Sequence, residues 1–238
     1  MENITAIDHI ALYAHPIILL GMLKHRIFPK ANTILKRGAS MPQEGRKISI
    51  DGITFIAGDG KQASDIKGGL YEVFTEQTYK ELNVRGKYVL DIGCAFGDTL
   101  FYFAKKGAKM VEGYEINRKV YAMAMANARI NKRFPVIVVN KKATSSTIDD
   151  FAERYADQHK VLKIDCEGGE YEQILNAKKL GKYDQIIIEY HYGYLNLDRC
   201  LKNLGFITRH TIPHIAGSRC NMAVGILYAV RKTKTQGD

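Results

Sequence analysis

Two glycines and an acid near the middle of the chain have the types and spacing of a nucleotide-binding site. Asp91 lies within Tyr88-Val-Leu-Asp-Ile-Gly-Cys-Ala-Phe-Gly-Asp98, and Gly93 and Gly97 follow it four residues apart. Glycines let a ligand approach the backbone closely, and the first N–H groups of a following helix face such a ligand. This stretch differs from the dinucleotide pattern G-x-G-x-x-G, which packs around a pyrophosphate. It suits instead a nucleoside cofactor without phosphate that carries a cationic methionine end.

A second acid, Glu115, ends the next apolar run, Val111-Glu-Gly-Tyr-Glu115. A carboxylate about 20 residues beyond the glycine loop can accept hydrogen bonds from both hydroxyls of a ribose. Together the two segments resemble those of S-adenosylmethionine-dependent methyltransferases. The alternative is a glycine turn in an unrelated α/β protein. The agreement of strand, glycines, helix cap and second acid favours the cofactor site.

The elements that must position these residues alternate along the chain. Apolar runs predict strands at 88–90, 111–115, 136–140, 161–165 and 185–189. Helices are expected at 99–106, 119–131, 147–155 and 169–179, the first with Asp98 as its N-cap and Gly107 at its end. Two last strands, 205–211 and 222–230, have only a loop between them and should form an antiparallel hairpin. We therefore expect an α/β fold with a doubly wound, mostly parallel seven-stranded sheet, as in class I methyltransferases.

Residues 1–80 are expected to form a small helical and hairpin extension, and residues 81–238 the methyltransferase domain. Ile10 to Leu23 is largely apolar and basic residues follow it, which favours a packed helix over a membrane-surface anchor. Asp51-Gly52 is the strongest hairpin signal. Between that hairpin and the domain we expect a loop at 58–69 and a helix at 71–82.

A second informative stretch is Leu162-Lys-Ile-Asp165-Cys-Glu167-Gly-Gly169-Glu170. Ser146-Thr-Ile-Asp-Asp-Phe151 precedes it, and Ile186-Ile-Ile-Glu189-Tyr-His191 follows it. In this order the three segments resemble the FkbM family of methyltransferases, whose Asn-x-x-x-Asn after the second strand is similar to Asn127-Ala-Arg-Ile-Asn131. The resemblance covers about residues 70–190.

The resemblance implies S-adenosylmethionine as the cofactor. The family often has Asn where this chain has Phe96 and Pro where it has Ile116, and neither change removes a carboxylate or a glycine. The residues expected to contact the cofactor are Asp91, Gly93, Cys94, Phe96, Gly97, Glu115, Ile116 and Asp165.

The reaction that the resemblance implies is O-methylation of a sugar, glycan, lipid-linked glycan or small metabolite. A hydroxyl acceptor requires a general base, and His191, Glu189 and Asp165 are the candidates, His191 having the ordinary pKa nearest neutrality. Asp165 has two other interpretations, a cap of the next helix or an acceptor for the methionine amino group. Lys163 is expected to pair with Asp165 or Glu189 and hold it ionised.

A metal is the other chemistry open to Asp165, Glu189 and His191, because two carboxylates and one imidazole suit Mg²⁺ or Mn²⁺. An ordinary acid–base cluster is favoured, so no metal is expected.

The net charge of +10 is concentrated at the ends, with +4 on residues 1–50 and +5 on residues 191–238. Basic ends suit an anionic partner, a nucleic acid or a lipid surface, or simply a basic soluble protein. An RNA methyltransferase is therefore the alternative enzyme, although Asp165-Cys-Glu-Gly stands where an amino-methylation motif of the Asn/Asp-Pro-Pro-Tyr type would follow the fourth strand. A cofactor-binding module without activity is the third interpretation, which the full set of acids and glycines disfavours.

Cysteine usage and the N-terminal sequence favour a cytoplasmic protein. The four cysteines fit no zinc spacing and are expected to be free thiols in a reducing compartment. Acidic Glu2 and Asp8 stand where a secretory signal would be basic, and no apolar run is long enough for a membrane span. The oligomeric state is left open.

Overall fold

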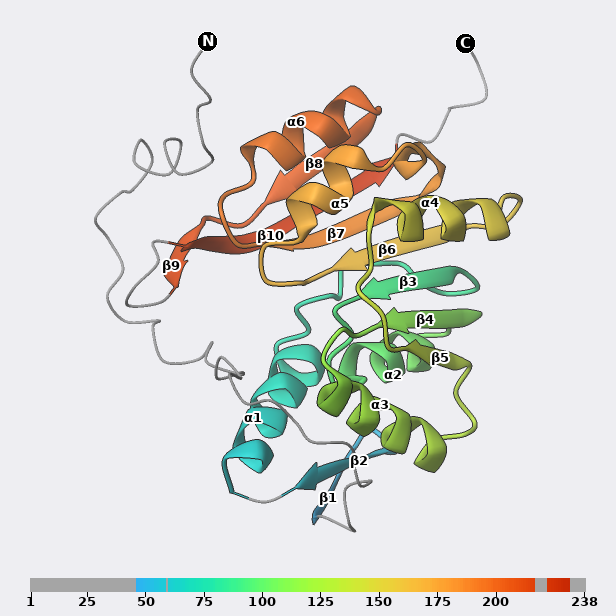
Figure 1. Cartoon of the computed structure of the whole chain (residues 1–238), viewed down its shortest axis with the longest axis vertical. Helices are drawn as coiled ribbons and strands as arrows, with labels where there is room; N and C mark the ends of the chain where they lie inside the picture. Colours follow the sequence, from blue (N-terminus) through green and yellow to red (C-terminus); the bar gives the residue numbers. More distant parts are fainter. Residues whose placement is uncertain (1–45, 59, 217–221, 232–238) are drawn as a thin grey trace.

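The computed structural model describes residues 46–58, 60–216 and 222–231, and its centre is one mixed sheet (Figure 1). Strands β5, β4, β3, β6 and β7 lie side by side in parallel, and β10 runs antiparallel between β7 and β8, with β9 paired to its first residues. This arrangement confirms the doubly wound fold with an antiparallel C-terminal hairpin. The strands are β3 (Tyr88–Ile92), β4 (Met110–Tyr114), β5 (Val136–Val139), β6 (Lys160–Ile164), β7 (Gln185–Tyr190), β8 (Phe206–His210), β9 (His214–Ala216) and β10 (Met222–Arg231).

Helices cover both faces of the sheet. Successive residues of its central strands point to opposite faces, so each strand contributes side chains to two cores. Val89 belongs to one hydrophobic core and Leu90 to the other. The first core packs under α2 and α3, and the second under α4, α5 and α6. The helices are α2 (Asp98–Lys105), α3 (Arg118–Ile130), α4 (Ser145–Arg154), α5 (Glu170–Asn176) and α6 (Leu195–Asn203).

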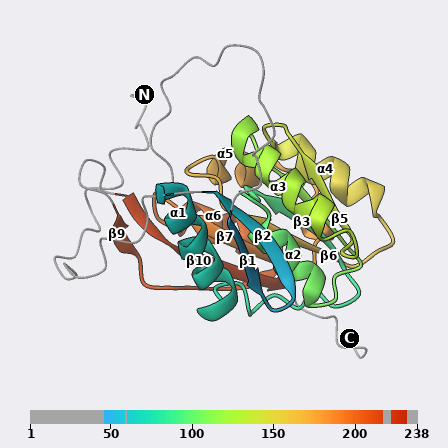
Figure 2. The same cartoon turned by 90° about the horizontal axis from the view of Figure 1, so that it is seen from below.

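The predicted hairpin is confirmed as β1 (Arg46–Ile50) and β2 (Ile53–Gly58). Its two turn residues, Asp51 and Gly52, have φ values of 55° and 78°, the left-handed pair that a tight hairpin turn requires. The hairpin lies beside α1 (Gly60–Leu70) and α3 (Figure 2).

Two asparagines of α3 bind this hairpin. Asn127 Oδ1 accepts a hydrogen bond from Ile56 N (2.8 Å), and Asn131 Oδ1 accepts one from Thr54 N (3.1 Å). The Asn-x-x-x-Asn spacing puts both amides on the same face of the helix, one turn apart. The motif therefore attaches the extension to the sheet domain.

The expectation for 58–82 was wrong, since α1 is helical where a loop was expected. A π-helical turn, Tyr71–Thr75, ends this helical region well before residue 82. The glycines at 60, 68 and 69 weaken helix propensity, but Ile66 and Leu70 bury one face of the helix. Tertiary packing outweighs propensity here.

Helix α2 also differs slightly from expectation. It begins at Asp98, with Gly97 as its N-cap at φ 94°, so Asp98 is the first helical residue and not the cap. The apolar segment at 10–23 lies outside the described residues. Among the helices that the structure does describe, none combines the length and the apolar character needed to cross a membrane.

Candidate active site

The glycine loop lies where β3 ends, in contact with the ends of β4 and β6. Gly93 has φ 78°, and a Cβ there would collide with the carbonyl oxygen of Asp165. The N–H groups of Gly93 and Cys94 both donate to the Tyr114 carbonyl, and Asp165 N donates to Ile92 O (3.0 Å). Only glycine permits this approach, which holds the ends of three strands together.

A buried ion pair between Lys163 and Asp91 holds the glycine loop in place. Lys163 Nζ lies 3.0 Å from Asp91 Oδ1 and donates to the Gly93 carbonyl (2.8 Å), while the Thr99 hydroxyl donates to Asp91 Oδ2. Both charged side chains are almost completely buried. Asp91 is therefore enclosed by the protein and holds the loop, and the structure does not support its predicted direct contact with a cofactor.

The predicted partner of Lys163 was wrong. The ion pair is made with Asp91, and neither Asp165 nor Glu189 forms a salt bridge with this lysine. Burial opposes the charge of Lys163, but the Asp91 and Asp165 carboxylates outweigh it and raise the pKa of the ammonium. Lys163 is thus a permanent buried cation with a positioning role, and the geometry does not support a catalytic one.

Cys94 and Phe96 direct their side chains into the hydrophobic core. Cys94 is fully buried, and burial, with a smaller contribution from Asp91, raises the pKa of its thiol. The Phe96 ring packs edge-on against Phe55, with ring centres 6.0 Å apart. The structure thus does not support side-chain contacts of these two residues with a cofactor.

Glu115 directly follows the end of β4 and is half-buried. Its Oε1 accepts a hydrogen bond from Asn117 N (2.6 Å). Burial raises the pKa of Glu115, and the N–H groups of Asn117 and Ala95 oppose that shift, so the carboxylate lies against the glycine loop. Ile116 beside it is 66% exposed, an apolar surface next to an acid.

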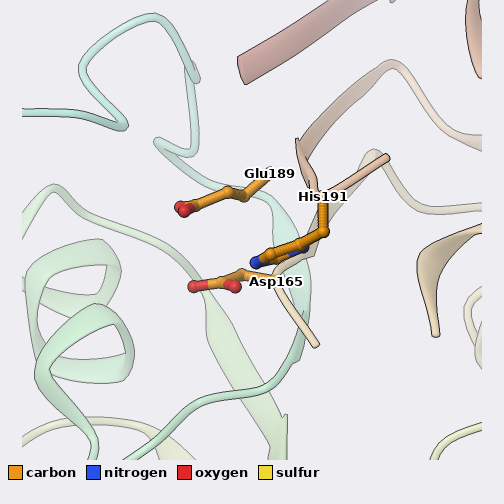
Figure 3. Close-up of side chains that lie close together, drawn as sticks. All are labelled: Asp165, Glu189 and His191. Atoms are coloured by element: carbon orange, nitrogen blue, oxygen red, sulfur yellow. The ribbon is translucent and has the colours of Figure 1, made fainter. Parts of the chain in front are cut away.

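Asp165, Glu189 and His191 converge at the ends of β6 and β7 (Figure 3). One nitrogen or oxygen atom from each lies within 4.8 Å of the others. The two carboxylates are half-buried, and the histidine is buried. The structure therefore brings together the three residues that the sequence selected for chemistry on the acceptor.

His191 is held by a carboxylate on each side of its ring. Glu170 Oε1 accepts a hydrogen bond from His191 N (2.9 Å) and lies 3.1 Å from Nδ1, while Glu167 Oε2 lies 3.6 Å from Nε2. Burial disfavours the charged ring, but Glu170 and the neighbouring acids outweigh it and raise the pKa of His191 to about 9. The surrounding acids thus favour a positive charge at this ring, which disagrees with the expectation of a neutral histidine base.

The other two residues of the cluster, Asp165 and Glu189, are acids whose carboxylates lie close together. Burial raises the pKa of Glu189 well above its usual range, and the nearby Asp165 carboxylate adds to the shift because two negative charges repel each other. The cluster therefore favours a bound proton or another positive charge between the carboxylates.

Sequence reasoning missed two residues of this region. Glu170 was treated only as an acid of a helix first turn, yet it is fully buried and also accepts from Gly168 N (2.8 Å). Its place in the acidic motif was the available signal. Tyr79 is buried with its ring centre 5.6 Å from Lys163 Nζ, and burial, then Asp165, raises the pKa of its hydroxyl. No sequence pattern marked Tyr79.

Comparisons with solved structures find the same fold. The chain is similar to the SAM-dependent methyltransferase from Agrobacterium tumefaciens (TM-score 0.52, 12% identity, covering 82% of this chain and 72% of that one). It is also similar to M. jannaschii TYW2, solved in complex with AdoMet (TM-score 0.50, 17% identity, covering 84% and 90%). At these identities the likeness establishes the fold alone.

Comparisons of sequence go further. A curated relative, uncharacterized protein 158B of Sulfolobus islandicus rod-shaped virus 1, is 29% identical over 119 residues, which are 49% of this chain and 68% of that protein. The model of the methyltransferase FkbM domain matches residues 82–208, more than half of the chain. With the glycine loop, the strand-end acids and the class I sheet in place, the chain belongs to the FkbM methyltransferase family.

Proposed function

We propose that this protein transfers the methyl group of S-adenosylmethionine to a hydroxyl oxygen of a sugar, glycan, lipid-linked glycan or small metabolite. The observation that carries the proposal is the cluster of Asp165, Glu189 and His191 at the strand ends, beside the glycine loop. In an open parallel sheet, ligands bind at the carboxyl ends of the strands. This location supports a role of the cluster beside the acceptor.

The residues around the glycine loop fit the proposed cofactor by the chemistry of their side chains. Glu115, half-buried against the loop, offers a carboxylate to the ribose hydroxyls, and the exposed apolar side chain of Ile116 suits an adenine face. At the other end of the loop, Asp165 offers a carboxylate to a methionine ammonium. When bound, the cofactor supplies an electrophilic methyl group on a sulfonium.

The residues of the cluster have distinct proposed tasks in this transfer. The acceptor oxygen bonds to the methyl carbon as the sulfur–carbon bond breaks, and the hydroxyl proton goes to a base. Asp165 and Glu189 have half-buried carboxylates that face the crevice, whereas His191 is buried and held by Glu170. We assign the proton to a carboxylate oxygen of Glu189 or Asp165, and to His191 the task of holding a positive charge beside them, either its own proton or a cation that replaces it.

An RNA acceptor is the second candidate, favoured by the basic ends of the chain. The acidic sequence Asp165-Cys-Glu-Gly after β6 favours the hydroxyl acceptor, because a motif for methylating a base amino group would stand at that position. Contact with an anionic membrane surface and a cytoplasmic location are further proposals. They rest on the basic charge and on the unpaired Cys94, Cys166 and Cys200.

Labelled-methyl transfer from S-adenosylmethionine into a lysate of the source organism tests the acceptor class. The products are fractionated into nucleic acid, carbohydrate, lipid and small molecules. We expect label in carbohydrate or solvent-extractable material, resistant to nuclease and stable in mild alkali as an ether is. Label that disappears on RNase treatment would establish the RNA acceptor instead, and alkali-labile label would indicate a carboxyl ester.

A further inference from the structure

The cluster at the ends of β6 and β7 has the composition of a cation site. It offers two carboxylates and one imidazole whose ligand-type atoms all lie within 4.8 Å of one another. Divalent cations bound at about 2.0–2.2 Å hold neighbouring ligand atoms about 3–4 Å apart. Small side-chain rotations of Asp165 and Glu189 would close the remaining gap.

The histidine is oriented as metal-bound histidines are. In such sites one ring nitrogen donates to a carboxylate, which fixes the ring and leaves the other nitrogen for the metal. Glu170, which is fully buried, fulfils this role because its Oε1 lies 3.1 Å from His191 Nδ1 and also accepts from the backbone N–H. Figure 3 shows a nitrogen of the His191 ring directed toward the Asp165 carboxylate.

Among the residues that the structure describes, the second ring nitrogen of His191, Nε2, has only a longer ionic contact, with Glu167. His191 Nε2 lies 3.6 Å from Glu167 Oε2, which is longer than a hydrogen bond. The Glu167 side chain is 76% exposed, so it can turn toward solvent or add a further oxygen ligand. The imidazole itself is only 4% exposed, which restricts access to Nε2 from directions other than the cluster.

We infer that Asp165, Glu189 and His191 bind a divalent cation of the Mn²⁺ type, with Glu170 as the positioning residue for the imidazole. Carboxylate oxygens suit both Mg²⁺ and Mn²⁺, and Mg²⁺ is bound almost entirely by oxygen ligands, so the added imidazole favours Mn²⁺ of the two. The sequence alone favoured an acid–base cluster. The contacts of the buried Glu170 with His191, which only the structure shows, change that preference.

A cation here would deepen the proposed function. Three protein ligands leave coordination positions open for acceptor oxygens, and adjacent hydroxyls of a sugar would fill two of them. The cation would polarise the reacting hydroxyl, and the second oxygen of Asp165 or Glu189 stays available for its proton. This role rests on the proposed methyl transfer, but the binding of the cation does not.

Titration of the chelator-stripped full chain with Mn²⁺ alone tests the site, with free Mn²⁺ followed by electron paramagnetic resonance. We expect one bound ion per chain, and at least tenfold weaker binding in Glu189→Gln and His191→Ala. Glu170→Gln, which touches no ion, should weaken binding about 10–100-fold, as loss of a carboxylate behind a histidine ligand does. The matched controls are His159→Ala and Asp157→Asn, two exposed side chains outside the cluster, which should bind as the wild type does.

Thermal unfolding without metal establishes that each variant is folded. Absence of saturable Mn²⁺ binding by the folded wild type, or equal binding by Glu189→Gln and the controls, would overturn the inference. Methyl transfer that persists after chelation, without Mn²⁺ binding, would discard the cation and leave the proposed function standing. Mn²⁺ binding that depends on the three ligands, in a protein that transfers no methyl group to any acceptor, would keep the site and discard the function.

Discussion

At the scale of residues, the buried carboxylates around the glycine loop differ in the partner that satisfies each. Asp91 has the Lys163 ammonium and the Thr99 hydroxyl, and Glu170 has His191 and a backbone N–H. A buried carboxylate is costly unless it is paired. Most of the acids in this region therefore have a structural task as well as a chemical one.

The Asp91–Lys163 pair predicts a large loss of stability when one partner is removed. Lys163→Met leaves the Asp91 carboxylate buried and unpaired, which should lower the free energy of unfolding by about 3–5 kcal/mol in urea titrations. Adding Asp91→Asn to the same chain should restore part of the loss. The matched control is Lys87→Met, from the partly exposed pair with Asp184, which should cost less than about 1 kcal/mol. Equal losses in the two lysine variants would contradict the role given to the buried pair.

The raised pKa of the buried Asp98 carboxyl predicts that the stability of the fold depends on pH. Burial raises its pKa from 3.8 to about 7, although the Lys163 ammonium and the Thr99 N–H oppose the shift. The folded state thus binds the proton more tightly than the unfolded state. The resulting stabilisation is complete below pH 3.8 and is lost as the pH rises through 7, by up to about 4 kcal/mol.

Asp98→Asn should flatten this dependence. Urea titrations between pH 4 and 8 should show a smaller fall in the free energy of unfolding for the variant than for the wild type. The exposed carboxylate of Asp157 provides the control, since Asp157→Asn should keep the wild-type slope. Parallel curves for wild type and Asp98→Asn would show that Asp98 does not bind the proton in the folded state.

At the scale of elements, α3 connects the hairpin to the glycine loop through one side chain. Asn127 accepts from Ile56 N in β2 (2.8 Å) and donates to the Phe96 carbonyl (2.9 Å). It is fully buried. The family motif Asn-x-x-x-Asn thus has a physical explanation in the attachment of β2 and in the position of the loop.

Asn127→Ala should therefore destabilise the protein by about 2–4 kcal/mol, because it leaves a buried N–H and a buried carbonyl without partners. Chemical unfolding measures this loss. Asn176→Ala, in an exposed position near the end of α5, is the matched control and should change stability by about 0.5 kcal/mol or less. If Asn127→Ala proves as mild as the control, the hydrogen bonds of Asn127 contribute little to holding the hairpin and the loop.

Most of the strands and the hairpin turn could be predicted from the sequence, whereas helix α1 could not. The strands were predictable because apolar runs such as Ile186–Ile188 are typical of a parallel sheet buried on both faces. The turn at Asp51-Gly52 was predictable from its own chemistry. Helix α1 was not, because its glycines conceal a face that is defined only by what it packs against.

The candidate site, too, could be predicted from the sequence only in part. Asp165, Glu189 and His191 were predictable because strand ends meet at one edge of a parallel sheet. The partner of Lys163 and the burial of Glu170 depend on which side chains the folded chain places within a few ångströms, and no local pattern contains that information.

At the scale of the whole molecule, two hydrophobic cores hold the central strands, whose ends carry the candidate site residues. The residues proposed to bind the ribose and adenine of the cofactor follow β4, and the cluster proposed to serve the acceptor lies at the ends of β6 and β7. Under the proposed function, Glu115 binds the cofactor and Glu189 serves the acceptor.

Calorimetric titration of the full chain with S-adenosylmethionine tests this division most directly. We predict one site per chain, at least tenfold weaker binding in Glu115→Ala, and wild-type affinity in Glu189→Gln and in the exposed control Glu153→Gln. Thermal unfolding should show a ligand-dependent rise for every chain that binds. A wild-type chain that does not bind S-adenosylmethionine, or a Glu115→Ala chain that binds it unchanged, would contradict the account.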